Sequence, residues 1–285
     1  MKFSILRSGS SGNCTFVEHK DTRLLIDAGG MSRKKLVEIL NEIDVDPCSI
    51  TAIINTHLHG DHLNRATLSF CRTFSVPLWI HQNNTEPFQQ IFGGKPSKRV
   101  EVNSFDEKFA IGEIMFEAFE IPHDARGLTF GFKFYPSNGC SDLIVGYATD
   151  LGYAPEDLTE HLSNVKVLCL EANHDPALLW DNPNRTWNHK KRVTGARGHL
   201  SNLQSAQTIE RIAKSSSSEI ETVILCHLSE DHNTPDLALG EVKRFLKEQG
   251  INLDIFYAQR HQRTVFYHLD KPEDIQQTSF VDQLV

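Results

Sequence analysis

The sequence lacks an uninterrupted apolar segment of the length that a membrane span needs, and residues 1–12 lack the apolar core of a signal peptide. Its six cysteines are scattered, and none of them forms a Cys-x-x-Cys pair. Cys169 and Cys226 lie inside apolar strand patterns, as small buried hydrophobic residues do. We therefore expect a cytoplasmic protein with reduced cysteines and no membrane contact.

An excess of positive charge is also missing. The 29 lysines and arginines stand against 37 aspartates and glutamates, and the net charge of -8 argues against a protein that coats nucleic acid non-specifically. A local basic groove stays compatible with that total, because electrostatic attraction also acts through patches. No linker or repeat interrupts the chain. We expect a single domain over 1–285, with a core at about 3–268 and a C-terminal tail at 269–285.

Histidine, in contrast, is abundant, with 14 residues in the chain. The segment 56–62 reads Thr-His-Leu-His-Gly-Asp-His, and imidazole and carboxylate are preferred ligands of divalent zinc, iron and manganese. It follows an apolar, β-branched run at 49–55 and precedes an amphipathic helical pattern at 62–74. The alternative is a solvated histidine-rich turn, but such turns rarely follow a core strand. We therefore predict a metal site here.

Apolar periodicity and turn residues predict a mixed α/β sandwich, in which two sheets are flanked by helices. Strands are expected at 3–6, 15–18, 23–27, 50–55, 77–81, 113–121, 128–135, 142–149, 165–171, 221–226, 253–258 and 264–268. Helices are expected at 32–42, 62–74, 84–92, 155–162, 201–214 and 235–248.

Three further candidate ligands stand where predicted strands end. They are His123, Asp150 and His227, each at the close of an apolar run. A single histidine at a strand end is more often a surface residue than a ligand. Together with the cluster at 57–62, however, the three suit a two-metal site in which Asp150 is the shared ligand.

The order of these residues resembles the metallo-β-lactamase superfamily over residues 3 to about 268. The resemblance implies a four-layer αββα sandwich with two divalent metal ions, whether zinc, manganese or iron, at one edge. It implies that the first ion is held by His57, His59 and His123, the second by Asp61, His62 and His227, and both by Asp150. A metal-bound hydroxide would be the nucleophile, with Asp61 among the catalytic residues. Asp27 matches the family's first, largely structural aspartate.

The resemblance allows several activities, and Asp150 reduces their number. Lactamases of the superfamily mostly place cysteine at this position, whereas Asp150 offers an oxygen ligand. An oxygen bridge resembles the thioesterase and phosphodiesterase branches. Further segments resemble the bacterial YycJ (WalJ) group, which is associated with 5'-to-3' exonuclease action on DNA; they are 8–13, 121–125, 170–175, 197–202 and 227–233. The chain lacks the large inserted cap domain of its RNA-processing relatives, since only about twenty residues separate Asp175 from Gly195.

Substrate contacts are expected around His199, just before the helical pattern at 201–214. A histidine beside the metals can contact a scissile phosphate and protonate its leaving oxygen; the alternative is a purely structural histidine. Neighbouring contacts are expected from Arg197, Ser201 and Asn202. Glu171 and His174 are expected to orient metal ligands; the alternative is that they are only structural residues at the strand end.

Upstream, residues 180–199 combine basic side chains and two tryptophans with a single acid. The basic residues are Arg185, Lys190, Lys191, Arg192 and Arg197, and the tryptophans are Trp180 and Trp187. Basic groups can track a phosphate backbone and aromatic faces can stack on bases. The alternative is a solvated loop whose tryptophans fold into the core. A weaker basic patch comprises Lys95, Lys98 and Arg99.

We favour a dinuclear metal-dependent hydrolase of phosphodiesters in nucleic acid, with DNA as the substrate of an exonuclease. The alternative enzyme is a phosphodiesterase for small molecules, such as cyclic nucleotides or sugar phosphates. A metal-stabilised binding protein without turnover is the third hypothesis, and the complete ligand set argues against it. The sequence leaves the metal, the polarity of cleavage and the oligomeric state open.

Overall fold

The computed structural model describes residues 1–93, 100–137, 143–215, 217–260, 262–264 and 267–268. The expected C-terminal tail and the weaker basic patch at Lys95, Lys98 and Arg99 lie outside these residues. No helix of the described part is long and apolar enough to cross a membrane. Cys14, Cys48, Cys71, Cys169 and Cys226 are free, while the cytoplasmic location stays a prediction.

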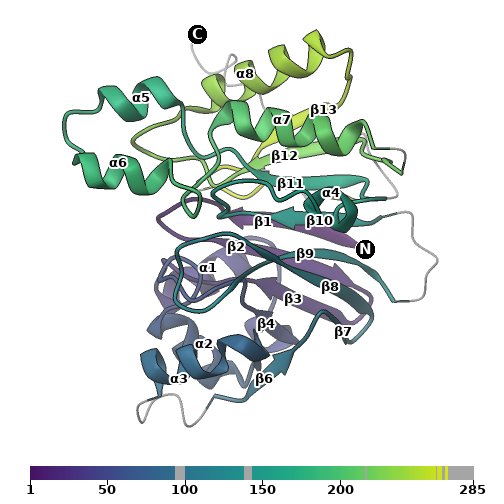
Figure 1. Cartoon of the computed structure of the whole chain (residues 1–285). Helices are drawn as coiled ribbons and strands as arrows, with labels where there is room; N and C mark the ends of the chain where they lie inside the picture. The colour runs from purple at the N-terminus through teal and green to yellow at the C-terminus, as the bar shows by residue number, and fades with distance from the viewer. Residues whose placement is uncertain (94–99, 138–142, 216, 261, 265–266, 269–285) are drawn as a thin grey trace, which may run out of the picture.

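Two seven-stranded sheets face each other, and helices cover their outer sides (Figure 1). The first sheet contains, in spatial order, β14 (Tyr267–His268), β1 (Lys2–Arg7), β2 (Cys14–His19), β3 (Thr22–Ile26), β4 (Ala52–Ile54), β5 (Leu78–His81) and β6 (Val102–Phe105). The second contains β13 (Asp254–Tyr257), β12 (Thr222–Cys226), β11 (Val167–Glu171), β10 (Val145–Ala148), β9 (Thr129–Pro136), β8 (Ile114–Ile121) and β7 (Lys108–Ile111).

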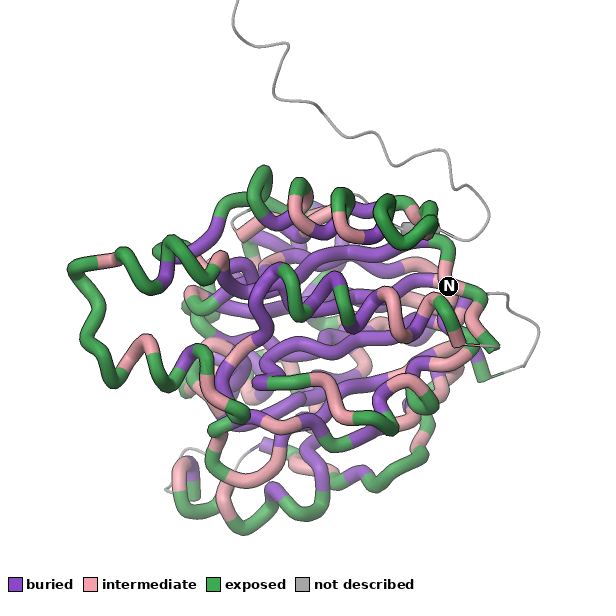
Figure 2. The backbone as a smooth tube through the Cα atoms, turned by 45° about the horizontal axis from the view of Figure 1, so that its top comes forward, coloured by how far each residue is buried: buried purple, intermediate pink, exposed green. Residues whose placement is uncertain are grey.

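The helices fall into three groups. Those beside the first sheet are α1 (Arg33–Asn41), α2 (Arg65–Phe74) and α3 (Thr85–Phe92), with short 3₁₀ turns at Pro47–Ser49 and Gln82–Asn84. Those beside the second sheet are α4 (Leu158–His161), α7 (Asn202–Ala213) and α8 (Pro235–Glu248). The remaining pair, α5 (Pro176–Asp181) and α6 (Trp187–Val193), projects from one side of the body (Figures 1 and 2). The expected four-layer αββα arrangement is confirmed.

Three apolar layers hold the sandwich together. The layer between the sheets is rich in phenylalanine, including Phe116, Phe132 and Phe134, while the two outer layers lie under the helices. Full burial of such a side chain stabilises the fold by roughly 1.5–3 kcal/mol. The central parallel strands β11 and β12 are covered on both faces and read as continuous apolar runs, whereas β8 alternates along much of its length.

Besides the two 3₁₀ turns, two strands and two helices were not expected from the sequence. Strands β6 and β7 lie at sheet edges and each buries only one of its four residues, so that they carry little apolar pattern. Helices α5 and α6 have only six and seven residues. The expected helix at 62–74 begins only at Arg65, because Asn64 caps it by accepting from the backbone N–H groups of Ala66 and Thr67.

The polar residues of interest follow the carboxyl ends of parallel strands from both sheets. Asp27 follows β3, Asp150 lies two residues after β10, and His227 follows β12. All three have positive φ, at 58°, 64° and 55°, which is rare for residues other than glycine. Such strained positions cluster at functional sites, because a fold retains them only where the surrounding structure enforces them.

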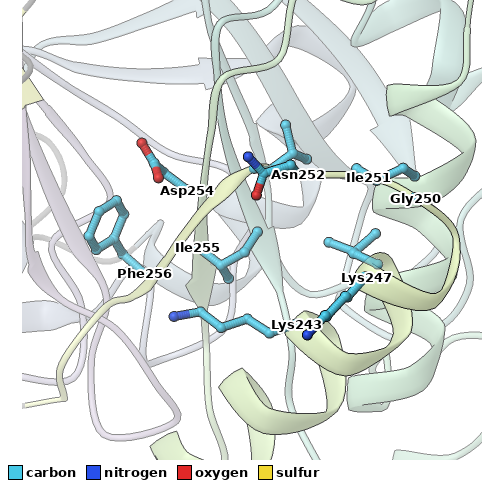
Figure 3. Close-up of a pocket in the computed structure, with 10 residues that line it drawn as sticks. Lys243, Lys247, Gly250, Ile251, Asn252, Asp254, Ile255 and Phe256 are labelled. Carbon is cyan, nitrogen blue, oxygen red and sulfur yellow. The ribbon is translucent and has the colours of Figure 1, made fainter.

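A cavity of about 710 Å³ lies at the edge of the second sheet, between α8 and β13 (Figure 3). Lys243 and Lys247 reach into it from α8, and Asp254 and Phe256 come from the strand. None of the residues that line it is a predicted site residue. The predicted site residues therefore lie elsewhere, at the strand ends.

Candidate metal centre and active site

Three histidines from two elements converge on one point. The Nε2 atom of His57 lies 3.1 Å from Nδ1 of His59, and Nε2 of His123 lies 3.2 Å from the same nitrogen. Two nitrogens bound to one tetrahedral zinc at about 2.0–2.1 Å would stand roughly 3.3 Å apart. The three ring nitrogens are therefore spaced as ligands of a single ion are.

A second group lies directly beside the first. Oδ2 of Asp61 is 3.5 Å from Nε2 of His62 and 3.6 Å from Nε2 of His227. Asp150 stands between the groups, with Oδ2 3.2 Å from Nε2 of His62 and Oδ1 3.8 Å from Nε2 of His123. The structure thus brings all seven predicted ligands together, with Asp150 in reach of both groups.

The polar atoms of this cluster suit a divalent cation. Oδ2 of Asp150 and Nε2 of His227 are buried and make no hydrogen bond to the described residues, which is costly for polar groups away from water. Burial would lower the pKa of His62, but Asp150, Asp27 and Asp61 raise it well above its usual value. The acidic surroundings therefore favour a cation here, and metal binding would displace protons from the histidines.

Asp27 orients one of the ligands from behind. Its buried carboxylate accepts hydrogen bonds from Asn55 Nδ2 at 2.8 Å and from the N–H and hydroxyl of Thr56 at 2.9 and 2.7 Å. It also lies 2.7 Å from Nδ1 of His62, so that Nε2 of this ring faces the cluster. The Nδ2 atom of Asn13 lies 2.9 Å from that Nε2 and would have to move for the nitrogen to bind a cation.

Glu171 holds two histidines at once. Its Oε1 lies 2.8 Å from Nδ1 of His199 and 2.9 Å from Nδ1 of His227, and its Oε2 accepts from the backbone N–H groups of Leu151 and Leu200. Burial would raise the pKa of this carboxyl, but His199 and His227 lower it to about 2. An ionised carboxylate only accepts, so both rings donate through Nδ1. Nε2 of His227 is then free for a metal and Nε2 of His199 for the pocket.

His174, also expected behind the ligands, does not line the pocket. It is buried, pairs with Ser201 as an isolated β-bridge, and accepts the backbone N–H of Asn202 at 2.9 Å. Burial lowers the pKa of its imidazole to about 4. Its neighbour Asn173 lies closer to the site, since its Nδ2 donates to the backbone oxygen of His227 at 2.9 Å.

A pocket of about 450 Å³ opens over the ligands. His199 lines one wall, and its side chain is 17% exposed. Arg185, His189 and Arg192 line it from α6 and the segment before it, facing the loop at 229–232.

The two arginines of this wall are paired with acids of the body. Arg192 makes a bidentate contact with Asp124, at 2.5 Å from Nε and 3.1 Å from Nη2, and Arg185 pairs with Asp231. Arg197 is exposed and donates from Nε to the backbone oxygen of His123 at 2.9 Å. Two arginines of the predicted basic stretch therefore line the pocket, and both also tie α6 and its surroundings to the body.

The tryptophans of the stretch are not part of the core, so the alternative of tryptophans folded into the interior is wrong. Trp180 is 39% and Trp187 61% exposed. Their rings touch each other, with centroids 5.0 Å apart. Local sequence did not reveal this, because a tryptophan in a short helix can face either way.

Ser201 and Asn202, expected among the substrate contacts, do not line the pocket. The Ser201 hydroxyl accepts from the N–H of Gln204 at 3.2 Å, and the Gln204 side chain accepts from the N–H of Ser201 at 2.9 Å, which is a capping box. Asn202 is fully buried and bonds to the Asn233 side chain. Both residues start and anchor α7.

Sequence reasoning did not single out Asp124, His189 and His232, which also line the pocket. Asp124 follows the ligand His123 directly, and its carboxylate is held by Arg192. His189 and His232 face each other across the pocket wall, with ring centroids 5.8 Å apart. His232 lies in the segment 227–233, which the resemblance had singled out only as a whole, and for His189 the excess of histidine was the signal.

Comparison with known proteins points to one superfamily. A family model described as the metallo-beta-lactamase superfamily matches residues 7–131. The chain is 30% identical over 239 residues to exodeoxyribonuclease WalJ of Streptococcus pneumoniae, which covers 83% of this chain and 85% of the relative. It is 27% identical over 253 residues to exodeoxyribonuclease YycJ of Bacillus anthracis, or 89% of this chain and 92% of that one.

Solved structures share the fold at lower identity. YhfI from Bacillus subtilis superposes with a TM-score of 0.66 at 17% identity, over 92% of this chain and 98% of the other. The short form of human tRNase Z gives a TM-score of 0.57 at 15% identity, with the same coverage of 92% and 98%. With its two sheets and its relatives in agreement, the chain belongs to the metallo-β-lactamase superfamily and is a metal-dependent hydrolase.

Proposed function

We propose that this protein is a dinuclear metal-dependent phosphodiesterase that acts on nucleic acid, as a 5'-to-3' exonuclease on DNA. The observation that carries the proposal is the pairing of two metal-ligand groups, joined by Asp150, with His199 in the same pocket. The exodeoxyribonucleases that this chain resembles over most of its length support DNA as the substrate.

The first group, His57, His59 and His123, would hold one ion, and the second, Asp61, His62 and His227, would hold the other, with Asp150 between them. When bound, the two ions would lower the pKa of a water and offset the negative charge of the phosphate. Manganese, zinc and iron all suit this set of nitrogens and oxygens.

Two side chains would handle the protons of the reaction. Burial would raise the pKa of Asp61, but His62 and His227 hold it well below its usual range, so Asp61 is an ionised acceptor at the pocket floor. It can orient the attacking water by accepting a hydrogen bond from it. His199, with Nδ1 bound to Glu171, points Nε2 to the pocket and can donate a proton to the leaving 3' oxygen.

Arg192, Lys190, Lys191 and Arg197 would supply the cationic approach for the phosphates. Arg192 lines the pocket, whereas the two lysines lie further out on the same helix. Ser201 and Asn202 would act indirectly, through the position of the segment that carries His199.

The test uses linear DNA labelled at the 5' or the 3' end, circular single strands, RNA, and bis-p-nitrophenyl phosphate, each with manganese or zinc. We expect mononucleotides released from the 5' end of linear DNA and no products from circles. Asp61→Ala should abolish this release. If wild type cleaves only bis-p-nitrophenyl phosphate, the nuclease proposal fails and a small-molecule phosphodiesterase is supported. Full activity in Asp61→Ala would contradict the site assignment.

A further inference from the structure

The helix α6 presents two opposite faces. His189, Arg192 and Val193 line the catalytic pocket. At 3.6 residues per turn, Trp187, Lys190 and Lys191 lie on the other side of the same helix. Figures 1 and 2 show that α5 and α6 project from the body, and most of their residues are exposed. We call Trp180, Trp187, Lys190 and Lys191 the outer patch.

The aromatic part of the outer patch is unusual for a surface. Trp187 is 61% and Trp180 39% exposed, and the two rings, from two different helices, touch with an interplanar angle of 48°. Large aromatic side chains that gather on a surface mark an interaction site more often than single exposed apolar residues do.

The charged side chains of α6 and the segment before it are divided between the two faces of the helix. Arg185 and Arg192, beside the pocket, pair with Asp231 and Asp124. Among the described residues, Lys190 and Lys191 have no acidic partner; Lys190 donates to the backbone oxygen of Trp180 at 2.6 Å. The Nζ of Lys191 lies 5.7 Å from the Trp187 ring centroid, as in a cation–π contact. The outward cations are thus left for an anionic partner.

Resting on the proposed nuclease function, we propose that the outer patch binds the single-stranded part of the DNA that extends from the pocket. Paired aromatic faces with adjacent cations match a single strand, whose bases can stack and whose phosphates attract lysine. A duplex hides its base faces. In a chain of net charge -8, this local complementarity is a reason to expect the substrate rather than non-specific adhesion.

The position of the patch predicts a dependence on chain length. A helix with its side chains is about 10–12 Å across, so the outer patch is separated from the pocket by roughly that distance. A dinucleotide held at the metals would not reach it, whereas a longer strand would pass over α6. The patch should therefore strengthen the binding of long single strands and contribute little to short ones.

The experiment measures binding without cleavage. The metal-loaded protein is titrated with a phosphorothioate oligothymidylate of about 30 nucleotides, and tryptophan fluorescence is recorded alongside anisotropy of a labelled strand. We expect quenching in wild type, and Kd about 5-fold or more weaker for Trp187→Ala and for Trp180→Ala. Lys190→Gln with Lys191→Gln should reduce the salt dependence of Kd. Leu237→Ala, an exposed leucine on α8, serves as the surface control and should bind as wild type does.

Several outcomes would overturn the inference. They are wild-type affinity in both tryptophan variants with unchanged melting temperature, equal quenching by a duplex of the same length, and equal quenching by polyglutamate, which would point to an acidic protein partner. In steady-state assays, the loss of kcat/KM in Trp187→Ala should be larger on the long strand than on a dinucleotide. If wild type binds and is quenched by the strand but cleaves no DNA, the nuclease function fails while the binding patch stands.

Discussion

At the scale of single residues, Glu171 connects the predicted metal site to the proposed acid. One buried carboxylate oxygen lies within 2.9 Å of Nδ1 in both His199 and His227. Because the carboxylate stays ionised at neutral pH, it fixes which nitrogen of each ring faces the pocket. The sequence predicted these residue types in the right order, but the sharing of one oxygen is visible only in the structure.

His199→Ala tests the proposed proton donation. We expect kcat on DNA to fall by about 10²–10⁴-fold, because the 3' alkoxide is a poor leaving group that needs a proton. The fall should be much smaller with bis-p-nitrophenyl phosphate, whose nitrophenolate leaves without one. The measurement is kcat for both substrates at saturating metal. Equal losses on the two substrates would indicate that His199 acts only in binding or folding.

At the scale of elements, the loops that carry the ligands pack so tightly that glycine is required. A Cβ added at Gly29, in the loop after β3, would lie 2.3 Å from the backbone nitrogen of His62 and 2.4 Å from the carbonyl carbon of Asp61. A Cβ at Gly60, inside the ligand segment, would meet nothing within 4 Å. A side chain is therefore sterically excluded at Gly29 but not at Gly60, although both glycines stand close to predicted ligands.

We expect Gly29→Ala to push the 60–62 backbone out of place, at a cost of about 1–3 kcal/mol or more in folding free energy, with reduced metal content. Gly60→Ala is the matched control and should keep the metal content and melting temperature of wild type. Metal analysis of the purified variants, together with thermal unfolding, provides the comparison. Normal metal content in Gly29→Ala would mean that the loop adapts.

A comparison of the elements shows which helices and strands the local sequence pattern predicts and which it does not. The buried strands and the helices α7 and α8 were expected within a few residues, since their apolar periodicity is strong. Edge strands β6 and β7 were not predicted, because most of their side chains are in contact with solvent and give little apolar pattern. Helices α5 and α6 escaped because each is too short to show a helical period.

At the scale of the whole molecule, the proposed metal site lies across the two sheets. The first sheet contributes Asp27 and the 57–62 segment, while the second contributes His123, Asp150 and His227. Bound ions would therefore tie the two halves together, and would stabilise the native state by mass action.

Removal of metal should show this coupling. A chelator is expected to abolish hydrolysis and to lower the melting temperature by several degrees, since a ligand at 100 times its Kd stabilises by about 2.7 kcal/mol. Adding back manganese or zinc should restore both properties in wild type, but only weakly in Asp150→Ala. Differential scanning calorimetry and metal analysis provide the readout. An unchanged melting temperature after verified metal loss would contradict the view that the ions join the sheets.

The sequence by itself determined the candidate ligand types, their order and the sandwich, because the chemistry of side chains and strand periodicity are local properties. The tertiary structure decided which side chains reach the pocket. Ser201 and Asn202 anchor the start of α7 and do not line the pocket. His189 and His232 lie in the pocket wall. Trp180 and Trp187 are exposed. These outcomes depend on how helices and loops are placed against the body, and that placement is set by contacts between residues far apart in the chain.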